Sequence, residues 1–333
     1  MPENASVFQK IQAGVEVTAG TGVAANKLFT ALGIDPSPSF EIDRFRPSGF
    51  KYETLAALTY EQVEADIGGR QTYTEIIYAL ASLVNKPTPT TPAGGTTSRQ
   101  WTFESAIAGP DAPATYTIEV GSSVRAHKFT NFIINELSMT WAKTAAPELS
   151  GSGFGRALDD NAVTLTGSPT SIALVPVLPT QLDTYKEATG TAVAAAAPTN
   201  RILRDFSLSW SLSGRYSPVR VLNSANPSFE THVESEPELG MELQVAVDAE
   251  GMGFLTDLRN GTQTFIGLRG NGATIETTIK YALRVNTCVA VVDSDGFDDN
   301  DGARVVTWNL GGQYNATWTK AFSIEVINTL AAL

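Results

Sequence analysis

The chain has 333 residues and carries 23 Lys and Arg against 35 Asp and Glu, a formal net charge of −12 at pH 7. This length predicts two domains, each able to bury a core of its own. The acidic balance argues against a nucleic-acid-binding protein, because gripping phosphates requires clustered cations.

Residues 1–29 are polar and small, and we expect them to form an N-terminal arm. The first ten residues have neither the basic nor the apolar segment of a signal peptide, and no apolar run reaches 18 residues. We therefore expect neither secretion by that route nor a membrane anchor. Gly20, Gly22 and Ala25 have the spacing of a dinucleotide fingerprint. Two prolines in the following segment, ALGIDPSPS, break the expected strand and helix, which favours the arm over a nucleotide site.

A first module is predicted over residues 30–165. Ser39–Phe45 forms a short strand, and residues 62–67 alternate apolar with polar side chains as a half-buried strand does. Thr72 and Glu75 then form a capping box at the start of a helix.

The rest of this module is predicted to contain further strands and two irregular segments. Residues 86–98, rich in Pro, Thr and Gly, are expected to be an unpacked linker. The glycine-rich segment SGSGFG (150–155) lacks the Lys-Ser/Thr of a phosphate-binding loop, which favours a mobile or contact-making loop.

Residues 166–199, which contain the low-complexity run TGTAVAAAAPT, are predicted to link the first module to a second over residues 200–333. The second module begins with a strand whose apolar residues alternate with serines over 206–213. A strand over 239–247 directs Glu242 and Gln244 outward, and a short helix follows over 250–259 and ends at Asn260-Gly261.

The two modules share an order of elements and a short motif. Arg44-Phe45-Arg46-Pro47 and Arg215-Tyr216-Ser217-Pro218 both end the first strand, and they are 171 positions apart. We interpret this as a tandem duplication of one β-rich module.

Candidate chemical sites are few. Cys288 lies in the apolar run TCVAVV, which is typical of a buried, inert thiol, and His127 and His232 are too few for ordinary zinc sites. The acidic segment DSDGFDDNDG (293–302) lacks the ligand spacing of an EF-hand, which favours a solvated hairpin tip over a weak cation site. We expect no enzyme, no catalytic residues, no metal and no cofactor, although paired carboxylates of a glycosidase stay open at this stage.

Several separated segments resemble one family. These are AGTGVAANK, FRPSGFKYETLA, the run RYSPVRVLNSANPSFETHVESEPELGMELQVAVDAEGMGFL, DDNDGARVVTWNL and ATWTKAFSIEVINTLAAL. Together they look like the major tail tube protein of long-tailed, non-contractile bacteriophages, in a form with two fused modules.

This resemblance implies a mainly β fold with minor α. Two tandem tail-tube β-sandwich modules, each with one flanking helix, would contribute strands to a ring-shaped inner β-barrel. The implied function is a structural subunit of the virion, made in the host bacterial cytoplasm. Its rings would stack into the conduit for genome delivery. The alternative is a non-enzymatic carbohydrate-binding or fibre β-sandwich protein.

The implied partners are other copies of the chain, in a trimeric ring with pseudo-sixfold symmetry or a hexamer. Tape measure, tail tip and tail terminator proteins would join them, and double-stranded DNA would pass through without specific binding. The lumen-facing candidates are Glu64, Asp66, Glu242 and Gln244. The assembly-contact candidates are Arg44, Phe45, Pro47, Arg215, Tyr216, Pro218, Gly151, Phe154, Asp295 and Asp298.

Overall fold

The computed structural model describes residues 8–122, 124–159, 163–222 and 227–333. The fold is mainly β, with three α-helices in these ranges, α1 (Ile76–Leu83), α2 (Gly190–Ala194) and α3 (Gly253–Asn260). The strands of the first half are β1 (Lys10–Val15), β2 (Lys27–Leu28), β3 (Leu32–Phe45), β4 (Leu55–Arg70), β5 (Arg99–Phe103), β6 (Tyr116–Gly121), β7 (Ala126–Ala142), β8 (Ala145–Gly155) and β9 (Thr170–Ser171). Those of the second half are β10 (Leu182–Glu187), β11 (Asp205–Ser213), β12 (Tyr216–Val219), β13 (Thr231–Glu234), β14 (Glu238–Ala246), β15 (Thr264–Glu276), β16 (Ile279–Asn300), β17 (Ala303–Gly312) and β18 (Phe322–Asn328).

The two halves repeat one pattern of strand pairing. In the first half the order is β3-β4-β8-β7, and β7 continues into a pair with β6, which in turn pairs with β1. In the second half the order is β11-β14-β17-β16, and β16 pairs with β15, which pairs with β10. All of these pairs are antiparallel. We call the two four-stranded groups the N-terminal sheet and the C-terminal sheet.

One strand pair joins the two groups. The second part of β7 pairs with β11 over six residue pairs, from Leu137↔Leu212 to Ala142↔Ser207. The two sheets are therefore one continuous eight-stranded sheet, with β3 at one end and residues 293–300 of β16 at the other.

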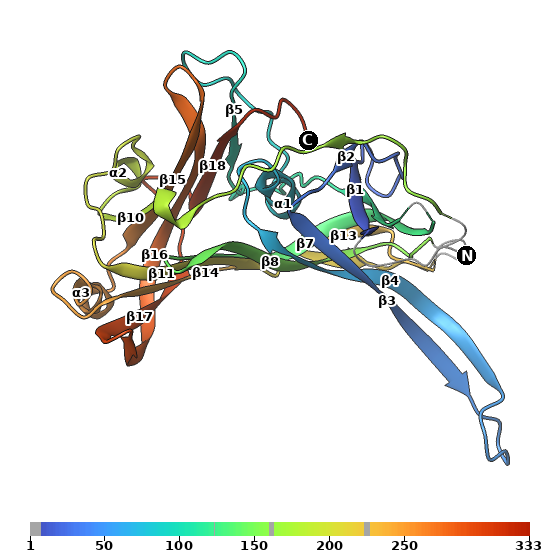
Figure 1. Ribbon diagram of the computed structural model, residues 1–333. Helices are drawn as coiled ribbons and strands as arrows, with labels where there is room; N and C mark the ends of the chain where they lie inside the picture. Colours follow the sequence, from blue (N-terminus) through green and yellow to red (C-terminus); the bar gives the residue numbers. More distant parts are fainter. Residues whose placement is uncertain (1–7, 123, 160–162, 223–226) are drawn as a thin grey trace.

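The main core lies on one face of this sheet. Apolar side chains of the strands alternate toward that face, where α1 packs against β7 with every side chain buried (Figure 1). Met139, Trp210, Leu243 and Trp308 belong to this cluster, one from each of four neighbouring strands. The alternation of apolar and polar residues thus places one face in the core and leaves the other polar.

The ends of α1 and α3 agree in part with the sequence. The Thr72 hydroxyl accepts from the Glu75 backbone N–H, as in a capping box, but the Glu75 carboxylate accepts from Thr30, Ala31 and Leu32 instead of completing it. The end of α3 at Gly261, with φ of 61°, is the left-handed cap that Asn-Gly predicts.

Three segments expected to be irregular are strands. Residues 10–15, predicted as part of an arm, form β1 because Ala13 and its neighbours pack on the core. SGSGFG lies inside β8, where glycine allows close strand approach; a Cβ on Gly151 would lie 2.2 Å from the Glu136 carbonyl oxygen. Residues 182–187, predicted as linker, form β10. Residues 1–7 of the predicted arm lie outside the described residues.

Candidate assembly surface

The face of the eight-stranded sheet opposite the core is polar and solvent-accessible. Its side chains come from the alternate positions of each strand, as the residue pairing shows. They are Asp35, Ser37, Glu64, Asp66, Ser150, Ser152, Glu136, Ser138, Thr140, Ser207, Ser209, Ser211, Glu242, Gln244, Thr307, Asn309 and Asp293. Small hydroxyl and acidic residues therefore cover most of this face, which we call the polar face. Phe154 lies on the same face, directly opposite Glu64, but is buried with Tyr216 and Phe229.

All four lumen-facing candidates lie on the polar face. Glu64 and Asp66 are exposed on β4, and Glu242 is exposed on β14 beside the half-buried Gln244. Arg70, at the end of β4, is paired with Glu148 at 2.5 Å between Nη1 and Oε1, so its charge is balanced locally. The centre of the face thus carries negative charge from both halves of the chain.

Each end of the eight-stranded sheet leaves a strand edge open. Among the described strands, β3 pairs with β4 alone. Residues 293–300 of β16 pair with β17 alone, whereas the matching part of β7 has β8 on one side and β11 on the other. An open edge presents unpaired N–H and C=O groups to a further strand.

Two prolines reduce the donors at the β3 edge. The β3–β4 pairing continues unshifted past Pro36 and Pro38, as expected when a proline nitrogen faces away from the partner strand. The open edge of β3 therefore lacks the two N–H groups that other residues would supply there.

The far end of the β3–β4 hairpin projects from the body of the protein (Figure 1). It carries exposed apolar side chains on both strands and on the connection between them: Phe40, Ile42, Phe45, Phe50, Tyr52, Leu55 and Leu58. Arg44 on this segment pairs with Glu53 at 3.4 Å, and both side chains are largely exposed. Pro47 is exposed on the same connection. Such a contiguous apolar segment on a thin projection is typical of a protein contact site.

The matching residues of the second half are buried. Arg215 is 1% exposed at the bend between β11 and β12, where Asp111 and Glu234 bind its guanidinium. Tyr216 packs with Phe154, Ile133 and Phe229 in a small cluster. Their contacts lie within the chain, so an assembly role for Arg215, Tyr216 and Phe154 stays a prediction. The shared Arg-aromatic-x-Pro motif therefore has two different environments, and the repeat resides in the strand pairing.

The acidic tip predicted at 293–302 is a solvated hairpin end. β16 and β17 meet at a two-residue turn, Asp301-Gly302, in which both residues have positive φ. Asp295 and Asp298 are exposed, and the Asn309 side chain donates to Asp293 and Asp295. Pro218, the last of the assembly candidates, lies on β12 opposite His232.

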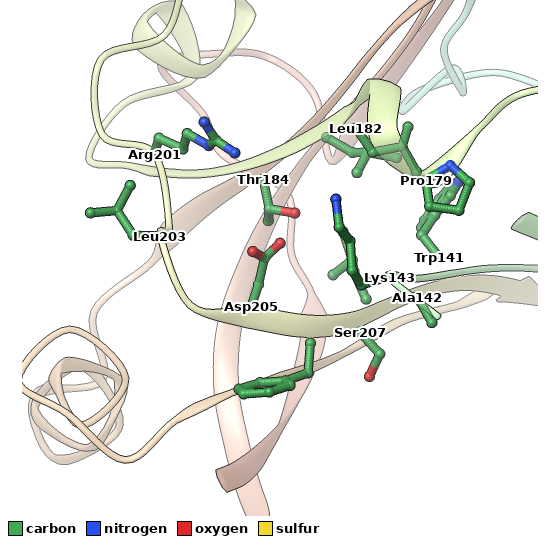
Figure 2. A pocket seen from close by; sticks show the side chains of 13 residues that line it. Trp141, Ala142, Lys143, Pro179, Leu182, Thr184, Arg201, Leu203, Asp205 and Ser207 are labelled. Carbon is green, nitrogen blue, oxygen red and sulfur yellow. The ribbon is translucent and has the colours of Figure 1, made fainter. Parts of the chain in front are cut away.

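A pocket of about 230 Å³ lies where the two halves meet. Figure 2 shows Trp141 and Lys143 at the end of β7 near Leu182 and Thr184 of β10, with Asp205 and Ser207 of β11 alongside. Its lining contains neither histidine nor cysteine.

Cys288 is fully buried, as expected, and burial raises the pKa of its thiol to about 11. No group of three or more His, Cys, Asp or Glu side chains arranged to hold a metal ion occurs among the residues that the structure describes. None of the described helices has both the length and the apolar character needed to cross a bilayer.

Comparison with known proteins gives a structural likeness. No family model matches the chain, and no curated protein matches it. Among solved structures, the SPP1 tail tube, determined by solid-state NMR and cryo-EM, matches 46% of this chain and 80% of its own, with 10% identity and a TM-score of 0.28. The matched structure is a tail tube, the class that the sequence resembles. A superposition this loose transfers no function to this chain.

Proposed function

We propose that this chain is a structural subunit of a bacteriophage tail tube, in which rings of two-module chains stack into a conduit for the genome. The observation that carries the proposal is the pair of open strand edges at the two ends of the eight-stranded sheet. Within the chain, the first strand of the C-terminal sheet pairs with the last strand of the N-terminal sheet. Repetition of that pairing between chains, β3 of one copy on β16 of the next, closes a ring.

Ring closure gives dimensions that suit the function. Each chain supplies eight strands, so three chains supply about 24. At about 4.8 Å per strand and about 40° of tilt, the backbone barrel is about 48 Å across, which leaves on the order of 35 Å inside the side chains. Duplex DNA fits through such an opening. A ring of three also removes every open edge of the shared sheet.

The polar face supports the same arrangement. The core side of the sheet is covered by α1 and its neighbours, so in a closed barrel the polar face is the inner one. Acids such as Glu64, Asp66 and Glu242 then line the lumen, where like charge repels the phosphates and lets DNA slide without binding. This charge distribution fits a conduit better than it fits a DNA-binding protein.

The projecting β3–β4 hairpin is our candidate for contact between stacked rings. Its exposed apolar side chains lie beyond the body of the subunit, where a neighbouring ring can cover them. By the sequence resemblance, the tape measure, tail tip and tail terminator proteins complete the assembly in the virion.

Negative-stain electron microscopy of the purified protein over a range of concentrations tests the proposal. We expect rings about as wide as the calculated barrel plus its outer layer, and tubes of stacked rings at higher concentration. A chain that stays monomeric under all conditions, or one that binds or cleaves glycans as a monomer, would contradict it. A carbohydrate-binding or fibre β-sandwich predicts no ring.

A further inference from the structure

The N-terminal and C-terminal sheets differ at one matched position, which lies near the β7–β8 hairpin in the first and near the β16–β17 hairpin in the second. The β7–β8 hairpin ends with the pair Ala142↔Ala145, and the β16–β17 hairpin ends with Asn300↔Ala303. Three residues before those ends, Met139 lies opposite Leu149 and Phe297 lies opposite Val306. Leu149 and Val306 are both core residues, so Met139 and Phe297 lie on the core side of their sheets.

These two positions have opposite surroundings. Met139 is 0% exposed because β11 lies beside it and the C-terminal half covers it. Phe297 is 56% exposed, and the Arg304 guanidinium lies over its ring, with 5.0 Å between Cζ and the ring centroid. Phe297 therefore lies on the core side of its sheet but is exposed, whereas its counterpart Met139 is buried.

A matching difference occurs beside β3. The pocket in Figure 2 lies between β10 and the start of β11, and the end of β7 (Trp141, Ala142 and Lys143) forms one of its walls. The counterpart groove beside the start of β3 has a volume of about 500 Å³. All of its lining comes from the first half of the chain, including the apolar side chains of Ile11, Ile34, Ile67 and Val120.

We infer that Phe297 of one copy is covered by a second copy of this chain, at the β3 edge beside this groove. This contact between two chains repeats the contact that the end of β7 makes with β10 and β11 within one chain. This inference rests on the proposed ring, and it adds that Phe297 sets the register between β16 of one copy and β3 of the next.

The register follows by counting along equivalent strands. Beside the C-terminal sheet, Met139 of β7 pairs with Trp210 of β11, and Trp210 in turn pairs with Met241 of β14. In the N-terminal sheet, Pro36 of β3 pairs with Ala65 of β4. Met241 pairs with Leu310, two residues before the end of β17, and Ala65 pairs with Gly153, two residues before the end of β8. Trp210 and Pro36 therefore occupy equivalent positions in the two sheets. Pro36 of the second copy therefore faces Phe297, and Asp35 faces Asp298.

Two features of this contact weaken the pairing of β3 with β16 of another copy. Pro36 and Pro38 remove N–H donors from the edge, and Asp35 and Asp298 set like charges opposite one another. The buried phenylalanine supplies a favourable term that offsets them. The same features discourage pairing of these edges with unrelated strands.

A cysteine pair tests the register directly. Asp35→Cys with Asp298→Cys places two thiols on directly opposite positions of neighbouring copies, whereas within one chain they are separated by seven strand spacings, roughly 34 Å. Native Cys288 is fully buried and does not compete. After mild oxidation with diamide we expect disulfide-linked dimers and closed trimers on non-reducing gels. The single variants and the mismatched pair Asp43→Cys with Asp298→Cys serve as controls.

A second variant tests the aromatic contact without a disulfide. Phe297→Ser is expected to raise the concentration needed for ring formation at least about tenfold, since the ring no longer buries an aromatic side chain. Tyr314→Ser, which removes an exposed aromatic ring outside β3, β16 and the projecting hairpin, is the control and should leave ring formation unchanged. Circular dichroism of the monomers confirms that both variants fold.

The outcomes separate this inference from the proposed function. Tubes of wild-type protein without cross-links in the Asp35 and Asp298 pair, and with unchanged ring formation in Phe297→Ser, would overturn the inference and leave the tube. Cross-linked closed trimers that never stack would support the inference and count against a tube. Absence of both rings and cross-links would overturn both.

Discussion

Arg215 and Asp111 form a buried ion pair across 104 positions of sequence, with 2.5 Å between Nη2 and Oδ2. The same guanidinium binds Glu234 and the carbonyl oxygens at the end of α1, Leu83 and Val84. This arginine thus ties the β12–β13 hairpin of the second half to the helix and a loop of the first half. Burial lowers the pKa of Arg215, but Tyr216, Asp111 and Glu234 more than offset it and the pKa is raised, so the charge persists at all accessible pH values.

Replacing Arg215 by Ala is expected to reduce the free energy of unfolding by about 3–5 kcal/mol, because it leaves Asp111 buried without its partner. Arg44→Ala, at the matching position of the sequence motif, removes only an exposed pair with Glu53 and should cost less than about 1 kcal/mol. Urea unfolding of both variants measures the difference. Equal losses would show that the burial of Arg215 contributes nothing.

Glu276 should make the 96–98 segment sensitive to acid. Its carboxylate accepts from the backbone N–H groups of Thr96, Thr97 and Ser98 and from the hydroxyls of Thr96 and Ser98. Hydrogen bonds from the Ser98 and Thr96 side chains, followed by those from their backbone, hold the pKa of Glu276 well below its ordinary value near 4.5.

The sign of the pH dependence follows from that depression. A carboxylate whose pKa is lower in the folded state stabilises the fold above its unfolded pKa, and this stabilisation is lost as the pH falls. We expect the stability of the wild type minus that of Glu276→Gln to be constant above pH 5 and to decrease steadily below it. Thermal unfolding from pH 2 to pH 7 gives the comparison. A difference that does not change with pH would exclude this linkage.

Pro36 and Pro38 are expected to restrain assembly. Replacing both by Thr restores two N–H donors to the open edge of β3, so β16 of a second copy can form more ladder bonds. We predict a lower concentration for ring formation, and some non-specific aggregation, by light scattering and sedimentation. Pro87→Thr, outside the described strands, is the matched control. No change in the double variant would mean that β3 does not pair between chains.

The acidic polar face should influence DNA passage more than assembly. The triple variant Glu64→Lys, Asp66→Lys, Glu242→Lys places cations along the proposed lumen, where they attract phosphates. We expect tubes that form normally but slow genome ejection, with the delay relieved by added salt. A variant with Lys at the exposed loop positions Glu230, Glu236 and Glu250 carries the same charge change and serves as the control. Normal ejection from the polar-face variant would place these acids outside the lumen.

Local sequence patterns were sufficient to predict many of the elements. Alternation along residues 206–213 and 239–247 predicted half-buried strands, and the Asn-Gly at 260–261 predicted the end of α3, because both depend on neighbours in sequence. The exposed character of the tip at 293–302 followed from its charge. The direction of Glu64, Asp66, Glu242 and Gln244 also followed from strand periodicity, although their common face required the pairing of four distant strands.

The segments that were misjudged are those whose partners lie far away in the chain. β1 has weak local signals and forms because β6, about a hundred residues later, pairs with it. The glycines of β8 resemble a loop, yet they are required where β7 and β8 approach closely. The amino-acid sequence alone determined the mainly β composition, the two-sided strands and the acidic charge, since these are properties of short windows. Only the tertiary structure decided that β7 pairs with β11 and that matching edges stay open at β3 and β16, because strand pairing joins residues by long-range hydrogen bonds that no local pattern encodes.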